Sequence, residues 1–271
     1  MDIQQFYRKK AKTHLLLAGI STAGSLILLA ALYILNWPSF QYWNSLLFIP
    51  AGIPIALGMS LAAKRRAGRI QLTVPDTPAV FTEQRRMILV PFVHWLKEYV
   101  YFTMKGEAVV LIREDTTGLK KAGTFLLHLI GLRRYLRKRL LVSNQQGILY
   151  RLYKDAGWKQ RYHLYEEASG EEIGSYDMNL WNVKRQYSTL YDGEGHRIGE
   201  NEGGFTGIHF QVLDEEKEKC VDIKFDGIPL EAMNLFGGVR GDIVTARRDL
   251  GSHTPVYLLA PLIVELHYTR S

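Results

Sequence analysis

Two long apolar runs dominate the start of the chain. They extend from His14 to Leu35 and from Phe40 to Ala63, and neither contains Asp, Glu, Lys or Arg. Each is close to the ~20 residues that a helix needs to cross the hydrocarbon core of a bilayer. The pattern predicts a transmembrane helical hairpin over residues 1–69, with spans at about 14–35 and 40–63.

Basic residues flank both runs, whereas the loop between them carries no charge. The flanking residues are Arg8, Lys9, Lys10 and Lys12 before the first run and Lys64, Arg65, Arg66 and Arg69 after the second. The positive-inside rule then predicts a multi-pass protein of the cell membrane, with the N-terminus and the C-terminal domain in the cytoplasm. The alternative is a cleaved signal peptide, but the first run is longer than the apolar core of such a leader.

Residues 70–97 combine turn signals with a short apolar stretch. Pro75 and Pro78 indicate turns, and the ten residues from Met87 are apolar except for His94. This stretch is too short to span a bilayer, and Pro91 indicates a break within it. We expect a linker followed by a helix that is packed on the domain or lies in the membrane interface.

From residue 98 onward, short β-rich runs alternate with turns. Tyr99–Phe102 and Ala108–Ile112 flank the plausible turn at residues 105–107 and predict a hairpin. Further β-rich runs are Ile148–Tyr153, Arg161–Tyr165, Tyr187–Tyr191 and Ile208–Leu213. Strands at this spacing with little helix between them predict an antiparallel sandwich or barrel.

An internal repeat accompanies these strands. The sequence LYEEASGEEIG at 164–174 is followed by LYDGEGHRIG at 190–199 and by a looser copy, FQVLDEEKEKCVDI, at 210–223. Each copy reads as a strand end, an acidic turn and a return strand. Tight hairpin turns favour Asp and Gly, so these acidic residues indicate turns rather than a calcium site.

With these repeated hairpins and an apolar final segment, residues 98–271 resemble the tubby C-terminal-like superfamily. This superfamily includes tubby-like proteins, phospholipid scramblases and LURP-one-related proteins. The resemblance implies a closed antiparallel barrel of about a dozen strands around one central hydrophobic helix near the C-terminus. It also implies lipid binding, although no lipid-site residue can be transferred position by position.

The candidate for the central helix is Thr254–Tyr268. Its first two residues suit an N-cap followed by proline at the first helical position, and it is apolar on all sides over most of its length. Pro261 disfavours a continuous helix, so a buried strand over Leu262–Tyr268 is the alternative. The predicted fold class is therefore membrane-anchored and mainly β, with two transmembrane helices followed by an antiparallel β-barrel with a central hydrophobic C-terminal helix.

The net charge of +7 is concentrated in one segment, because no acidic residue lies between Asp115 and Asp155. Within it, Thr124–Leu141 has leucines at helical spacing and basic residues on another side. Such a helix either lies in the membrane interface or packs its apolar stripe on the domain. The candidate residues for contact with the membrane or with anionic lipid are Lys120, Lys121, Arg133, Arg134, Arg137, Lys138 and Arg139.

No catalytic pattern is evident in the sequence. We find no zinc-protease motif, no nucleophile elbow, no phosphate-binding loop and no dinucleotide fingerprint. The eight histidines lack metal-ligand spacing, and the single cysteine, Cys220, lies in a strand-like context typical of a small core residue. The sequence therefore predicts neither an enzyme nor a cofactor or metal site.

The function that fits these features is a non-enzymatic, membrane-tethered tubby-like domain. We expect it to contact anionic lipid headgroups or membrane proteins at the cytoplasmic face, since basic segments close to a membrane are attracted to the anionic leaflet. For a tethered chain the membrane is a nearer anionic surface than nucleic acid, which is not expected as a partner. The alternatives are scramblase-like lipid movement and a structural or regulatory adaptor without lipid specificity.

Overall fold

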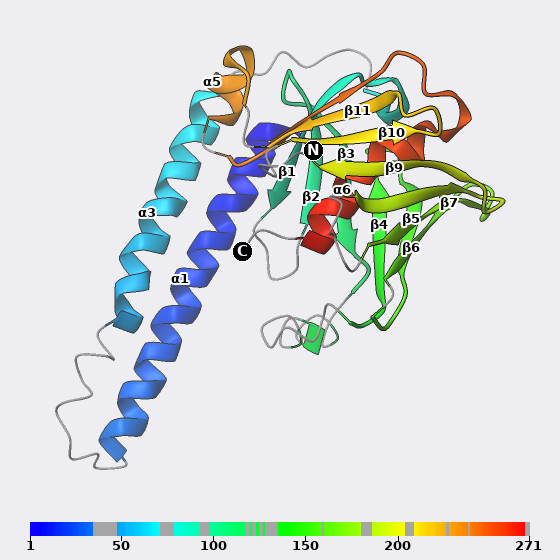
Figure 1. The fold of residues 1–271 in the computed structure, drawn as a ribbon. Coiled ribbons are helices and arrows are strands. Elements are labelled where there is room, and N and C mark those ends of the chain that lie inside the picture. Colours follow the sequence, from blue (N-terminus) through cyan, green and yellow to red (C-terminus); the bar gives the residue numbers. More distant parts are fainter. Residues whose placement is uncertain are drawn as a thin grey trace. The chain divides into compact units, whose positions relative to one another are not determined.

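The computed structural model describes most of the chain (Figure 1). The described residues are 1–34, 48–70, 79–92, 98–116, 120, 123–124, 127, 135–158, 160–179, 186–203, 209–225, 228–237 and 239–268. The chain divides into two compact units, Met1–Leu72 and Thr73–Ser271. The first unit is helical and the second is mainly β.

The first unit is an antiparallel pair of helices, α1 (Ile3–Ile34) and α3 (Phe48–Arg69). The Gln4 side-chain amide donates to the carbonyl of Ala67 at 2.9 Å, and the Ser60 hydroxyl donates to the carbonyl of Ala11 at 2.8 Å. Because residues early in α1 contact residues late in α3, the two helices run in opposite directions. The hairpin topology of the pair therefore agrees with the sequence prediction.

Helix α1 is long and apolar enough to cross a membrane, and among the described residues it alone meets both criteria. Large apolar side chains along it are exposed, including Leu15, Leu16, Ile20, Leu26 and Ile27. The second predicted span, 40–63, falls partly on residues 35–47, which lie outside the described residues. The structure thus provides one candidate span, and the second stays a prediction.

The second unit is a closed antiparallel barrel of twelve strands, in which β12 returns to pair with β1. The predicted barrel and its predicted C-terminal helix are both confirmed. The strands are β1 (Arg86–Phe92), β2 (Glu98–Thr103), β3 (Ala108–Glu114), β4 (Lys138–Ser143), β5 (Ile148–Lys154), β6 (Arg161–Glu166), β7 (Glu172–Met178), β8 (Gln186–Asp192), β9 (Arg197–Gly203), β10 (His209–Asp214), β11 (Lys219–Lys224) and β12 (Asp242–Ala246).

The expected helix within residues 70–97 is wrong where the structure has β1. Met87 and Leu89 belong to the barrel core, and Ile88 and Val90 on the opposite face are buried as well. A strand covered on both faces reads as a continuous apolar run, which periodicity cannot distinguish from a buried helix. Pro91 is tolerated because the described pairing of β1 with β12 ends before it, at Leu89.

Helix α6 (Thr254–Tyr268) fills the barrel (Figure 1). Its apolar side chains are buried, and strand residues hydrogen-bond with its backbone: the hydroxyl of Tyr101 donates to the carbonyl of Leu258 at 3.0 Å. The predicted central helix is confirmed, and the alternative strand over residues 262–268 is wrong. Pro261 lies inside the helix, where it removes one backbone donor, but burial on every side outweighs that cost.

The segment that enters the barrel is also fastened to it. A short 3₁₀ turn, η2 (Phe81–Glu83), buries Phe81 against the ring of Tyr101, with 5.5 Å between the ring centroids. Just before it, the backbone N–H of Ala79 donates to the carboxylate of Glu107 in the β2–β3 turn at 3.0 Å. These contacts place residues 79–83 at the barrel end where strands β2 and β3 are joined.

The three sequence repeats correspond to the hairpins β6–β7, β8–β9 and β10–β11. Acidic side chains close the turns of the second and third hairpins, as the sequence predicts. The Asp192 carboxylate accepts the N–H groups of Glu194 and His196 at 3.0 and 2.8 Å, and Asp214 accepts the N–H of Glu218 at 2.8 Å. The acids of the repeat therefore stabilise turns.

Candidate functional site

The predicted basic helix over Thr124–Leu141 is wrong at its C-terminal end. The described residues 120, 123, 124 and 127 are helical, but β4 begins at Lys138 and pairs with β3 and β5. Ladder hydrogen bonds on both edges override the helical spacing of the leucines in this segment. Leu140 therefore points into the barrel core rather than along a helical stripe.

The predicted contact residues have different positions in the structure. Lys120 is exposed, whereas Lys121, Arg133 and Arg134 lie outside the described residues. Arg137 is exposed directly before β4. Lys138 and Arg139 follow in the strand and point to opposite faces, since side chains alternate along a strand. The structure therefore brings residues 137–139 together without placing all three on one face.

Of these three residues, Arg139 occupies the outer surface of the barrel. Its guanidinium lies 5.7 Å from the centre of the Tyr153 ring on β5. By contrast Lys138 is half-buried, opposite Lys154. This interaction does not neutralise the charge of Arg139, because a ring face attracts a cation without carrying a net charge.

An exposed group of apolar side chains lies beside these basic residues, and sequence reasoning missed it. Tyr135 and Trp158 contact each other, with 5.3 Å between ring centroids, and Leu136 follows Tyr135 in the chain. Trp158 is 74% exposed. The Gly157 N–H donates to the Tyr135 carbonyl at 2.8 Å, which joins the two connections that carry the rings. We call Tyr135, Leu136 and Trp158 the aromatic tip.

Barrel topology explains why the aromatic tip and the basic residues meet. Strand β4 begins at Lys138 and strand β5 ends at Lys154, so the connections next to these residues lie at the same end of the barrel. Tyr135 and Trp158 are 23 positions apart in the sequence, and only this pairing brings them together. The available sequence signal was an aromatic residue, Tyr135, within the basic run at 133–139.

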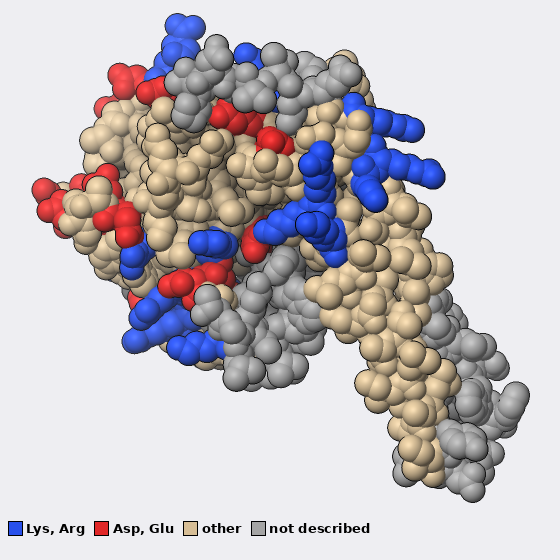
Figure 2. All heavy atoms as spheres, turned by 180° about the vertical axis from the view of Figure 1, so that it is seen from behind, with Lys and Arg blue, Asp and Glu red and all other residues tan. Residues whose placement is uncertain are grey.

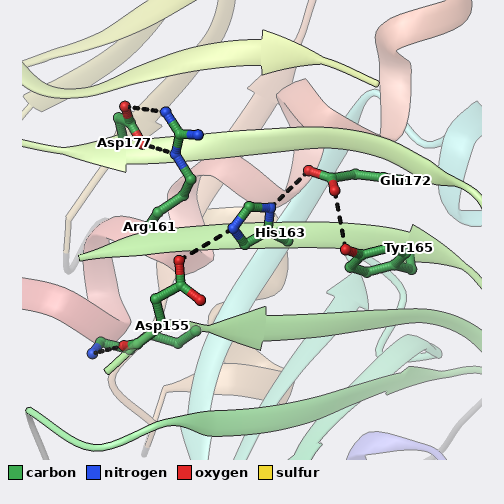
Figure 3. A network of polar contacts seen from close by, with 7 residues as sticks. Asp155, Arg161, His163, Tyr165, Glu172 and Asp177 are labelled. Atoms are coloured by element: carbon green, nitrogen blue, oxygen red, sulfur yellow. Dashed lines mark hydrogen bonds and ion pairs between the residues drawn. The ribbon is translucent and has the colours of Figure 1, made fainter. Parts of the chain in front are cut away.

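Two outward arginines on the strands that follow β4 have carboxylate partners, and one of these pairs, Arg161 with Asp177, is drawn in Figure 3. Arg161 on β6 forms a bidentate pair with Asp177 on β7, with 2.6 Å between Nη2 and Oδ2, and these hydrogen bonds raise the pKa of Arg161. Arg151 on β5 pairs in the same way with Glu167, at 2.7 Å from Nη2 to Oε1. Neither arginine is free to bind an anion.

Beside Arg161, a histidine lies between two carboxylates (Figure 3). His163 Nδ1 is 2.8 Å from Glu172 and Nε2 is 3.3 Å from Asp155, while the Tyr165 hydroxyl donates to Glu172 at 3.0 Å. Burial, followed by the hydrogen bond to Glu172, raises the pKa of Tyr165. These contacts join neighbouring strands, so the network stabilises the sheet as cross-strand pairs do.

Charge on the barrel is correspondingly mixed. On the face shown in Figure 2, Lys and Arg form separate groups, and Asp and Glu lie among several of them. On this face, the described Lys and Arg residues therefore do not form one uniformly basic surface. What distinguishes residues 135–139 is the combination of exposed arginines with exposed aromatic and aliphatic side chains.

At the opposite end of the barrel, three carboxylates lie close together. Oxygen atoms of Asp214, Glu216 and Glu218 are within 4.8 Å of one another. Arg247 neutralises part of this charge, with 3.2 Å to Asp214 and 2.8 Å to Glu218. The carboxylates belong to the β10–β11 turn and are held there by Arg247, which gives them a structural role.

Cys220 is a core residue, as the sequence predicts. Its side chain is 1% exposed, and its Sγ donates to Asp214 at 3.6 Å. Burial, followed by the charge of Asp214, raises the pKa of the thiol to about 11. A thiol that stays protonated at neutral pH is a weak nucleophile.

No protein-family model matches the chain, and no curated protein matches it in sequence.

Proposed function

We propose that this protein is a membrane-tethered, tubby-like domain that contacts anionic lipid headgroups at the cytoplasmic face of the cell membrane and catalyses no reaction. The tether is the α1–α3 hairpin. The exposed apolar side chains of α1 would be costly in water and suit lipid, and the second apolar run supplies a returning span.

The orientation follows from the antiparallel arrangement of the two helices. Because Gln4 contacts Ala67, both ends of the hairpin lie on the same side of the membrane if both helices cross it. The basic flanks assign that side to the cytoplasm. The barrel, which follows α3 in the chain, is then cytoplasmic as well.

The tubby-like assignment rests on the resemblance of the repeated hairpins and on the architecture. Twelve antiparallel strands close around α6, which follows the last strand in the chain. This is the arrangement that the resemblance implies. The same resemblance implies lipid binding, for which the exposed basic residues are the candidate contacts.

The observation that carries the lipid-contact proposal is the aromatic tip beside Arg137 and Arg139. Tryptophan and tyrosine rings favour the headgroup layer of a bilayer. A basic side chain close to an anionic leaflet adds about 1 kcal/mol of attraction. The two effects act on the same few residues at one barrel end, and Lys121, Arg133 and Arg134 are further candidates from the same segment.

A fluorescence experiment on the full-length protein tests this contact. In a Cys220→Ala background, an environment-sensitive probe is attached at Ala156→Cys, an exposed position beside Trp158. The protein is reconstituted in phosphatidylcholine vesicles with or without phosphatidylglycerol. We expect a blue-shifted emission and quenching by lipid-attached quenchers in the anionic vesicles, weakening as salt is added.

Matched charge variants show whether the basic residues matter. Arg137→Gln with Arg139→Gln should reduce the quenching several-fold. Lys105→Gln with Lys219→Gln removes the same charge from exposed positions at the opposite barrel end and should leave the quenching unchanged. A probe that remains in water in both kinds of vesicle, or equal effects of the two pairs, would contradict lipid contact and leave the adaptor as the better hypothesis.

A further inference from the structure

A cavity of about 240 Å³ lies at the barrel end where the β2–β3 and β4–β5 turns meet residues 79–83. The residues that line it include Val80, Phe81, Glu107, Val109, Leu149 and Tyr150. A cavity of about 150 Å³ admits benzene, so this one has room for a compact molecule on the order of ten non-hydrogen atoms. We call it the Glu107 cavity. It is separate from the aromatic tip, which adjoins the other end of β5.

Glu107 brings a carboxylate to this cavity from a well-fixed turn. The Thr103 N–H donates to the Glu107 carbonyl at 2.8 Å, and the Glu107 N–H donates to the Thr103 hydroxyl at 3.2 Å. One carboxylate oxygen accepts the N–H of Ala79 at 3.0 Å. Whereas Glu167 and Asp177 on the outer wall have arginine partners, no Lys or Arg among the described residues forms an ion pair with Glu107.

Tyr150 supplies a second polar group to the cavity. Its side chain is 8% exposed, and among the described residues its hydroxyl has no hydrogen-bond partner. Burial, followed by the charge of Glu166, raises the pKa of this hydroxyl, which therefore stays protonated at neutral pH. A buried tyrosine hydroxyl ordinarily finds a partner, so Tyr150 has hydrogen-bonding capacity that a ligand in the cavity can use.

The β4–β5 turn forms another part of the cavity wall and is held by its own hydrogen bonds. The side-chain oxygen of Asn144 accepts the N–H groups of Gln146 and Gly147 at 2.8 and 3.0 Å. Gln145 and Gln146 line the cavity and add amide groups without charge. Because both turns are fixed, the site is formed before a ligand arrives, which lowers the cost of binding.

The lining selects a chemical class of ligand. Phe81 and Val109 are 3% and 1% exposed and offer apolar walls beside the unneutralised carboxylate. An anion is repelled by Glu107, and a wholly apolar molecule would remove water from the carboxylate without replacing its hydrogen bonds. An ammonium group donates charge-assisted hydrogen bonds and compensates the charge.

We infer that the Glu107 cavity binds a small organic cation, with its ammonium group against Glu107 and its apolar body between Phe81 and Leu149. The ammonium group has three donors, and the Tyr150 hydroxyl is a further acceptor in the same cavity. This site is additional to the proposed lipid contact and does not depend on it.

Benzylammonium and benzyl alcohol test this inference on the full-length protein in detergent. The two compounds match in size and differ in charge. Saturation-transfer NMR, with protein-free micelles as the blank, measures their affinities. We expect benzylammonium to bind saturably and about tenfold more tightly than benzyl alcohol. Glu107→Gln, which retains an acceptor for Ala79, should abolish this difference, and Tyr150→Phe should weaken benzylammonium binding several-fold.

Two further variants make the result specific. Glu194→Gln removes a carboxylate that is 83% exposed in the β8–β9 turn at the same barrel end, and it should leave both affinities unchanged. Val80→Trp places a large ring at the cavity from a position that is 48% exposed. It should abolish binding of both compounds and leave thermal unfolding unchanged, so the inference stays testable if Glu107→Gln does not fold.

Three results would overturn the inference. They are the absence of saturable benzylammonium binding, equal affinities of the two compounds for the wild type, and binding that survives Val80→Trp. None of them affects the fluorescence of a probe at position 156 in anionic vesicles. The lipid contact and the cation site can therefore fail independently.

Discussion

The hydroxyl of Tyr176 on β7 donates a hydrogen bond to the backbone carbonyl of Val256 in the first turn of α6, across 2.7 Å. Tyr176 is fully buried. Two further buried bonds of this kind join the helix to the barrel wall, from Tyr101 to Leu258 and from Tyr257 to Ile198. The central helix is therefore fixed in rotation and depth by directional bonds as well as by apolar packing.

Removing one of these hydroxyls should destabilise the barrel. Tyr176→Phe deletes the donor to Val256 in a dry environment, and we expect the free energy of unfolding to fall by about 1–3 kcal/mol. Chemical denaturation of the detergent-solubilised protein measures this change. Tyr135→Phe, at an exposed ring, should change the value by less than about 0.5 kcal/mol. Equal effects of the two variants would show that the buried bond contributes nothing specific.

Gly174 permits the close approach of β7 to α6. A Cβ atom at this position would lie 2.7 Å from Val256 Cγ2 and 2.7 Å from the carbonyl oxygen of Tyr191. Gly174→Ala should therefore displace the helix and cost about 1–3 kcal/mol of stability, as overpacking of cores does. Thermal unfolding measures the loss. Gly123→Ala is the control, because no described atom lies within 4 Å of its Cβ, and it should not destabilise the protein.

Phe81 closes the barrel end next to Tyr101, and its truncation should be costly. Phe81→Ala removes a ring that is 3% exposed and leaves a cavity, for which we expect a loss of about 3–5 kcal/mol. Denaturant titration provides the measurement. Val80→Ala changes its neighbour, which is 48% exposed, and should have little effect. A small loss for Phe81→Ala would indicate that residues 79–83 are not an integral part of the barrel.

The buried thiol predicts a dependence of stability on alkaline pH. The pKa of Cys220 is raised to about 11 in the folded protein, whereas an unperturbed thiol has a pKa of about 8.5. Between these values the unfolded chain loses a proton that the folded chain retains, so stability falls as the pH rises. Cys220 contributes at most about 1.4 kcal/mol per pH unit to this fall.

Comparison with Cys220→Ala isolates this contribution, because the buried tyrosines titrate in both proteins. The difference in unfolding free energy between the wild type and Cys220→Ala should be constant below pH 8 and should shift in favour of the variant above about pH 9. Parallel curves across the alkaline range would show that the thiol has no raised pKa.

Strands with one solvent-exposed face can be predicted from the sequence. In β5, Tyr150 and Leu152 point inward and Arg151 points outward, an alternation that marks a half-buried strand. Strand β1 was not readable because Ile88 and Leu89 are both buried, on opposite faces. Strand β4 was missed for another reason, since Leu136 and Leu140 fit a helical period by chance and only pairing with β3 and β5 decides the outcome.

The residues of the candidate surface also differ in how far the sequence alone predicts their role. The basic residues at 137–139 were evident from composition, whereas Trp158 gained significance only when the pairing of β4 with β5 placed its connection beside that of Tyr135. Local patterns carry no information on which distant turns become neighbours. The arginines also differ in their partners, which their sequence positions do not indicate. Arg151 and Arg161 pair with carboxylates on adjacent strands or turns, whereas Arg139 contacts an aromatic ring.

The order of elements along the chain constrains how this protein is made. Ribosomes synthesise β1 first among the strands and α6 after all twelve, yet β1 closes the barrel against β12 and α6 occupies its interior. The barrel therefore lacks its core until α6 leaves the ribosome. The pairing of β1 with β12 joins residues that are far apart in the sequence, and such pairings form slowly. Until α6 has been synthesised, the nascent strands are therefore incomplete and prone to aggregate. We expect chaperones to shield them during this interval.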